Sequence, residues 1–174
     1  TELAQRIEAA AAAFHERGVR SGDVVALFAE NSPRWLVADQ GLMRAGAADA
    51  VRGASAPVEE LRYILEDCQA VALVVQNAEL WQRLQLSSEQ RQRLRFVVQL
   101  EGTPADGLIG FDELLATGPS SLGEAMDRSG DAVATILYTS GTTGQPKGVP
   151  LRHSNLLHQM RSLACVAYPA VGAP

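Results

Sequence analysis

The chain has 174 residues, enough for one domain or for part of a larger one. Its 47% hydrophobic and 20% charged residues are typical of a globular protein with a packed core, which excludes an intrinsically disordered chain. A formal net charge of −5 gives no sign of a nucleic-acid partner, so an anionic ligand must be attracted by a local group of residues.

Hydrophobic spacing and turn residues predict helices and strands that alternate along the chain. The first helix carries Leu3 and Phe14 on one face and ends near Gly18. The second helix begins with Ser32 as N-cap and Pro33 at its first position. Further helices are predicted over 57–68, 78–86, 111–115 and 154–167, strands over 24–28, 47–51, 71–75, 96–100, 133–138 and 148–151, and a loose segment over 118–130. This alternation predicts an α/β fold made of βαβ units with a largely parallel sheet.

The most informative segment reads Y-T-S-G-T-T-G-Q-P-K-G-V, from Tyr138 to Val149, directly after a buried strand. Its glycines allow positive φ and a close approach of the backbone to a ligand, and exposed amides in such a loop form a cradle for phosphate oxygens. Hydroxyl donors and one mobile ammonium group complete an anion site. The candidate phosphate-binding residues are Thr139, Ser140, Gly141, Thr142, Thr143, Gly144 and Lys147, and Gly148 is the third glycine.

Other glycine-rich motifs do not fit this segment. A P-loop needs Gly before its lysine and Ser or Thr after it, whereas Pro146 and Gly148 occupy those places. The dinucleotide fingerprint is absent, and Tyr138 stands where a nucleophile elbow around Ser140 needs its first glycine. A Ser/Thr/Gly linker is the remaining alternative from composition alone.

The segment from Tyr138 to Val149 resembles the phosphate-binding signature of the adenylate-forming (AMP-binding) superfamily. Leu151 to Leu156 is similar to the L-[ST]-H-x-N-L stretch that follows it, with Arg152 in place of the small hydroxyl residue. The Val51-Arg52 pair resembles the residues at the corresponding position of long-chain acyl-CoA and acyl-acyl-carrier-protein synthetases of photosynthetic bacteria. The resemblance therefore implies the first part of the large N-terminal domain of such an enzyme, over residues 1–174, truncated at both ends and without its C-terminal lid domain.

The resemblance also implies a function. Enzymes of this family join a carboxylate to ATP, release pyrophosphate, and pass the acyl group to CoA or a carrier protein. ATP and Mg²⁺ are the implied cofactors, Thr139 the candidate Mg²⁺ contact, and a long-chain fatty acid the favoured substrate. The catalytic lysine of the lid lies outside this sequence, so we expect no catalytic residue in it and no activity from the isolated chain.

Several alternatives stay open. His153 is a candidate substrate-site residue or a helix-start residue, and the parent could instead adenylate amino acids or be an inactive nucleotide- or carrier-binding relic. Cys68 and Cys165 are far apart and indicate neither a zinc site nor a disulfide framework, so we expect small buried residues in a reducing compartment. Without a signal peptide or a membrane-spanning run, we expect a cytoplasmic protein. The apolar segment 163–174 is a candidate for peripheral membrane contact, although core or acyl-pocket lining is the preferred interpretation.

Overall fold

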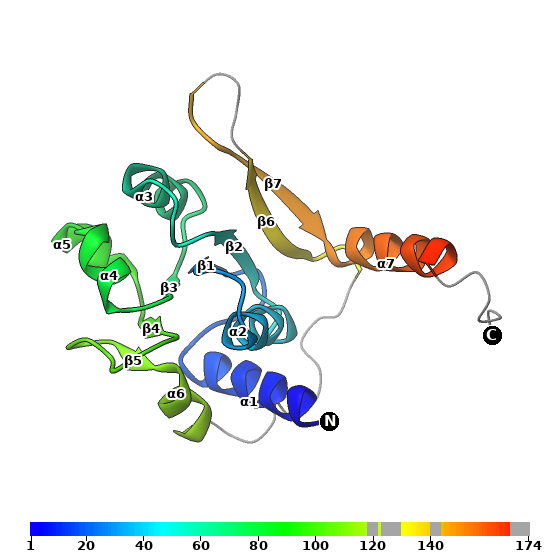
Figure 1. Ribbon diagram of the computed structural model, residues 1–174, viewed down its shortest axis with the longest axis horizontal. Coiled ribbons are helices and arrows are strands. Elements are labelled where there is room, and N and C mark those ends of the chain that lie inside the picture. Colours follow the sequence, from blue (N-terminus) through cyan, green and yellow to red (C-terminus); the bar gives the residue numbers. More distant parts are fainter. Residues whose placement is uncertain (118–121, 123–129, 140–143, 168–174) are drawn as a thin grey trace.

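The computed structural model describes residues 1–117, 122, 130–139 and 144–167 (Figure 1). The helices are α1 (Glu2–Glu16), α2 (Pro33–Arg44), α3 (Val58–Asp67), α4 (Ala78–Leu84), α5 (Ser88–Arg93), α6 (Phe111–Thr117) and α7 (His153–Ala167). The strands are β1 (Val24–Phe28), β2 (Ala48–Arg52), β3 (Ala72–Val75), β4 (Val97–Gln99), β5 (Ile109–Gly110), β6 (Val133–Thr139) and β7 (Lys147–Arg152).

The strands form one sheet in the order β5-β4-β3-β1-β2-β6-β7. Neighbouring strands are parallel from β5 through to β6, and only β7 runs antiparallel, against β6. Helices α1, α2 and α6 cover one face, and α3, α4 and α5 lie on the other (Figure 1). The predicted α/β fold with a largely parallel sheet is confirmed.

Local sequence explains where the helices begin and end. The Ser32 side chain accepts a hydrogen bond from the Trp35 backbone N–H at 3.1 Å, which satisfies one free donor of the first turn of α2. Gly46 follows that helix at φ +81, a conformation that suits glycine. Helix α4 ends two residues before the predicted Leu86, because Gln85 takes a left-handed φ of +42.

Alternate residues of β1 enter two hydrophobic cores. Val25 and Leu27 pack with α1, α2 and α6, whereas Ala26 and Phe28 pack with α3 and α4. This is the expected alternation of a strand that is buried on both faces. Cys68 is half-buried against the second core and its thiol is free, so it is less buried than expected. The side chain of Cys165 lies outside the described residues.

Strand β6 extends beyond its parallel neighbour. Only Thr135 to Leu137 pair with β2, while Tyr138 and Thr139 pair with β7 alone. The β6–β7 hairpin therefore projects past the edge of the parallel strands (Figure 1).

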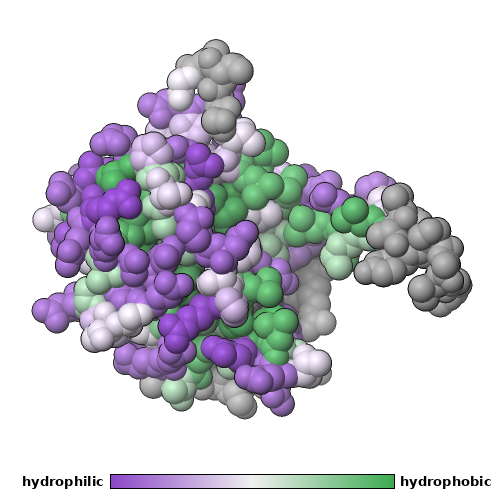
Figure 2. All heavy atoms as spheres, viewed as in Figure 1, coloured by the Kyte–Doolittle hydropathy of each residue, from purple (hydrophilic) through white to green (hydrophobic). Residues whose placement is uncertain are grey.

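Apolar side chains are exposed around the same hairpin and along α7 (Figure 2). Those of β6, β7 and α7 are Val133, Leu137, Val149, Leu157, Met160 and Leu163. Most of the segment 163–174, the candidate for membrane contact, lies outside the described residues. Across the described part of the chain, no helix combines the length and hydropathy required to cross a bilayer.

Candidate functional site

The β6–β7 hairpin brings the two ends of the glycine-rich segment together. Thr139, the last residue of β6, pairs in register with Lys147, the first residue of β7. Both residues are exposed, so their polar groups are accessible to a ligand. Four of the candidate phosphate-binding residues between them, Ser140, Gly141, Thr142 and Thr143, lie outside the described residues.

The two described glycines of the segment do different things. Gly144 takes φ +116 and has open space where a Cβ would stand, as a residue of a backbone cradle should. Gly148 does not take a positive φ, so the expectation of backbone freedom there is wrong. A Cβ on Gly148 would lie 3.0 Å from Cζ of Tyr138, so any larger residue there would crowd that ring.

Lys147 is the only lysine in the sequence. No carboxylate of the described residues forms an ion pair with its ammonium group. An exposed, unpaired ammonium group loses no internal partner when it binds an anion, and a compact charge on a flexible stem is well suited to phosphate.

Beside strand β6 lies a pair of carboxyl groups on β2 and α2 that the sequence pattern does not reveal. Asp49 on β2 is fully buried, pairs in register with Thr135 of β6, and lies beside Asp39 of α2. Burial, and then the neighbouring Asp39 carboxyl group, raise the pKa of Asp49 to about 9. Asp49 is therefore protonated at neutral pH. The available signal was an Asp in the middle of the apolar run 47–51.

The carboxyl edge of the parallel strands also carries a crevice. The loops after β1 and β2 leave toward opposite faces of the sheet, and a cavity of about 230 Å³ lies between them, lined by Glu30, Trp35 and Arg52 among others. Glu30 accepts hydrogen bonds from the backbone N–H and the hydroxyl of Ser55, which lower the pKa of its carboxyl group. Ligands of open α/β sheets commonly bind at this edge, which is also where β6 leads into the glycine-rich segment.

His153 is not brought close to Lys147. It lies at the other end of β7, roughly 20 Å away at about 3.3 Å per strand residue. There it lines a cavity of about 580 Å³ together with Gln40, Met43 and Leu156. His153 and Lys147 therefore do not belong to one cluster of side chains.

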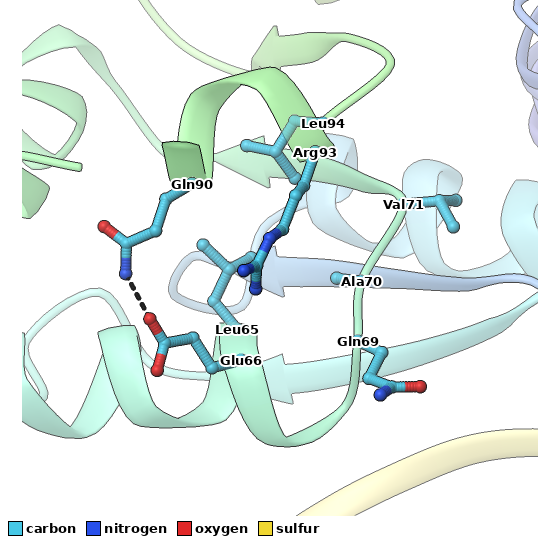
Figure 3. A pocket seen from close by; sticks show the side chains of 8 residues that line it. All are labelled: Leu65, Glu66, Gln69, Ala70, Val71, Gln90, Arg93 and Leu94. Atoms are coloured by element: carbon cyan, nitrogen blue, oxygen red, sulfur yellow. Dashed lines mark hydrogen bonds between the residues drawn. The ribbon is translucent and has the colours of Figure 1, made fainter. Parts of the chain in front are cut away.

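A third cavity, of about 380 Å³, lies between α3 and α5, next to the residue that precedes β3 (Figure 3). Glu66 there accepts a hydrogen bond from the Gln90 amide at 2.5 Å. The adjacent Asp67 instead accepts one from the Tyr138 hydroxyl at 2.6 Å. The two carboxylates thus have separate partners, as expected for neighbouring helix positions, and do not form a catalytic pair.

Comparison with known proteins identifies the class of this site. Residues 1–172 match the family described as AMP-binding enzyme. The chain belongs to the AMP-binding enzyme family. Membership confirms the resemblance carried by the segment from Tyr138 to Val149.

Relatives and solved structures agree with this assignment. The chain is 41% identical over 167 residues to the probable acyl-activating enzyme 16, chloroplastic, of Arabidopsis thaliana, covering 84% of this chain and 23% of that protein. It is 38% identical over 182 residues to the long-chain-fatty-acid–[acyl-carrier-protein] ligase AEE15, chloroplastic, of the same plant. This match covers 94% of this chain and 25% of that protein. ATP-bound MatB from Rhodopseudomonas palustris is 29% identical with a TM-score of 0.79, covering 94% of this chain and 31% of MatB. This AMP-binding chain thus spans about a quarter of the length of these two relatives.

The described residues of this family member contain no group of three or more His, Cys, Asp or Glu side chains that could hold a metal ion. Thr139, exposed at the end of β6, is a described hydroxyl next to the segment that could contact a metal ion held by a phosphate ligand. The donor set fits this arrangement, because Mg²⁺ is commonly bound through substrate phosphates and a few oxygen ligands.

Proposed function

We propose that this chain supplies the phosphate-binding part of an AMP-forming carboxylate–thiol ligase. Within such an enzyme it corresponds to the first part of the large N-terminal domain. The favoured substrate is a long-chain fatty acid and the acceptor an acyl-carrier protein or CoA, in the cytoplasm. The observation that carries the proposal is the β6–β7 hairpin, where Thr139 and Lys147 flank a glycine-rich segment and Lys147 forms no ion pair with the described carboxylates. The family match and the ligase relative support ATP and a fatty acid as ligands.

The reaction has two steps. A carboxylate oxygen attacks the α-phosphorus of ATP, the bond between that phosphorus and the bridging oxygen breaks, and pyrophosphate leaves with the electron pair. A thiolate then attacks the acyl carbon, and AMP leaves. The difficulty of the first step is to bring two anions together and to stabilise charge on the leaving group.

The residues of this chain would stabilise the negative charge on the leaving pyrophosphate. Thr139, Gly144 and the residues between them would bind the β- and γ-phosphates through hydroxyl and backbone N–H groups. Lys147 would neutralise charge on the departing pyrophosphate. Bound Mg²⁺ would supply further charge neutralisation, with Thr139 as its protein contact. The candidate substrate-site role of His153 then concerns the acyl group, near the cavity between α2 and α7.

The test is carboxylate-dependent exchange of labelled pyrophosphate into ATP by the full-length enzyme that contains this sequence. Long-chain fatty acids are expected to stimulate exchange, whereas amino acids and a reaction without carboxylate are not. Stimulation by amino acids alone would favour an amino-acid-adenylating enzyme. Absence of exchange with every carboxylate, in a folded protein that binds ATP, would indicate an inactive relic.

A further inference from the structure

Tyr138 ties the loop end of the β6–β7 hairpin to helix α3 on the sheet face. It is the last buried residue of β6, 6% exposed, and its hydroxyl donates a 2.6 Å hydrogen bond to Oδ2 of Asp67. Asp67 is the last residue of α3. Burial and the bond to Asp67 raise the pKa of Tyr138, so its hydroxyl remains a donor at physiological pH. The contact thus joins two elements that are far apart in the sequence.

The other side of the Tyr138 ring faces the backbone of β7. Tyr138 pairs in register with Gly148, where a Cβ would lie 3.0 Å from Cζ and 3.2 Å from Oη of the ring. The ring therefore lies against β7 while its hydroxyl reaches α3. The next pair in the ladder is Thr139 with Lys147, the two described residues that flank the phosphate-binding segment.

In the part of the chain that the structure describes, no other strand pairs with β6 at Tyr138 and Thr139 on the side away from β7. The ladder with β2 ends at Leu137, so Tyr138 and Thr139 pair only with β7. A two-stranded ribbon that leaves its sheet is weakly restrained, because an isolated hairpin is only marginally stable in water. The hydrogen bond from Tyr138 to Asp67 therefore fixes β6 at the level where β2 no longer pairs with it.

The geometry points to Tyr138 and Asp67 as a positioning pair that sets the place of Thr139 and Lys147 for binding of the ATP phosphates. Asp67 touches no ligand in this arrangement and acts through the Tyr138 hydroxyl. This inference rests on the proposed function, since the phosphate-binding role of the hairpin is what gives the pair its effect on ATP.

The experiment compares four single variants and one double variant in the full-length enzyme. Tyr138→Phe removes the donor, Asp67→Ala removes the acceptor, and Asp67→Asn keeps an acceptor oxygen. Tyr63→Phe is the matched control, since the Tyr63 hydroxyl donates to the other oxygen of Asp67 at 3.3 Å from within α3 itself. The readouts are the KM for ATP and the KM for the carboxylate in pyrophosphate exchange, with the melting temperature of each variant.

We expect Tyr138→Phe and Asp67→Ala each to raise the KM for ATP about tenfold, the size of a lost hydrogen bond to a charged group, with little change in the KM for the carboxylate. Asp67→Asn should recover most of the loss, Tyr63→Phe should behave as wild type, and the Tyr138→Phe/Asp67→Ala double variant should be no worse than either single variant.

An unchanged KM for ATP in Tyr138→Phe and Asp67→Ala would overturn the positioning role. Equal increases in the KM for ATP and in the KM for the carboxylate would also overturn it. Should Tyr138→Phe not fold, Asp67→Ala and Asp67→Asn decide the matter, because Asp67 is an exposed residue at a helix end. Failure of the proposed function is distinguishable, since the wild-type enzyme itself would then show no carboxylate-dependent exchange.

Discussion

Replacing Lys147 by Ala in the full-length enzyme is expected to lower kcat/KM for carboxylate-dependent pyrophosphate exchange about 10- to 100-fold. A hydrogen bond to a charged group contributes about 1.5–3 kcal/mol, and each 1.4 kcal/mol corresponds to a factor of ten. The loss should be large because no described residue pairs with Lys147, so its charge is free to act on the ligand alone.

Two control variants separate the local charge from other effects. Lys147→Arg keeps the charge and should recover part of the rate, although guanidinium geometry differs from that of an ammonium group. Arg152→Ala removes an exposed cation from the other end of β7, where it pairs with Asp131, and should leave exchange unchanged. Equal losses in Lys147→Ala and Arg152→Ala would argue for a general effect of surface charge.

Replacing Asp49 by Asn is expected to remove a large pH dependence of stability. The pKa of Asp49 is raised from 3.8 to about 9 by burial and by Asp39, so the folded state holds one proton more than the unfolded state between these pH values. The contribution of Asp49 to stability is therefore complete below about pH 4. It is lost as the pH rises toward 9.

The measurement is the free energy of unfolding by denaturant, from pH 5 to pH 9, for the wild type and for Asp49→Asn. The stability of the variant relative to the wild type should increase steadily with pH. Asp131→Asn is the matched control, because Asp131 is 85% exposed, and its curve should follow the wild type. Parallel curves for Asp49→Asn and the wild type would show that Asp49 is ionised in the folded protein.

Much of the fold follows from local sequence. The run 24–28 is apolar and short enough to be read as a buried strand, and Ser32-Pro33 marks the start of α2 through capping chemistry. Strand β5 could not be predicted, because two residues carry no periodicity. The glycine-rich segment is recognised by residue type and order, which is why it resembles a family signature before any geometry is known.

The contacts that support the site could not be predicted in this way. Asp39 and Asp49 meet only when α2 packs on the sheet beside β2, and the Tyr138–Asp67 bond joins residues 71 positions apart. The sequence showed each of these residues but not its partner. The sequence predicts backbone freedom at Gly148, whereas the structure gives it no positive φ and places it close to the Tyr138 ring.

The most direct test is hydrogen exchange over residues 138–149 in the full-length enzyme, with and without ligands. Amide exchange there should slow in the presence of ATP and of pyrophosphate, which share the phosphates that the segment is proposed to bind, and should be unaffected by adenosine. Exchange that ATP leaves unchanged, or that adenosine slows as much as ATP does, would contradict phosphate binding by the β6–β7 hairpin.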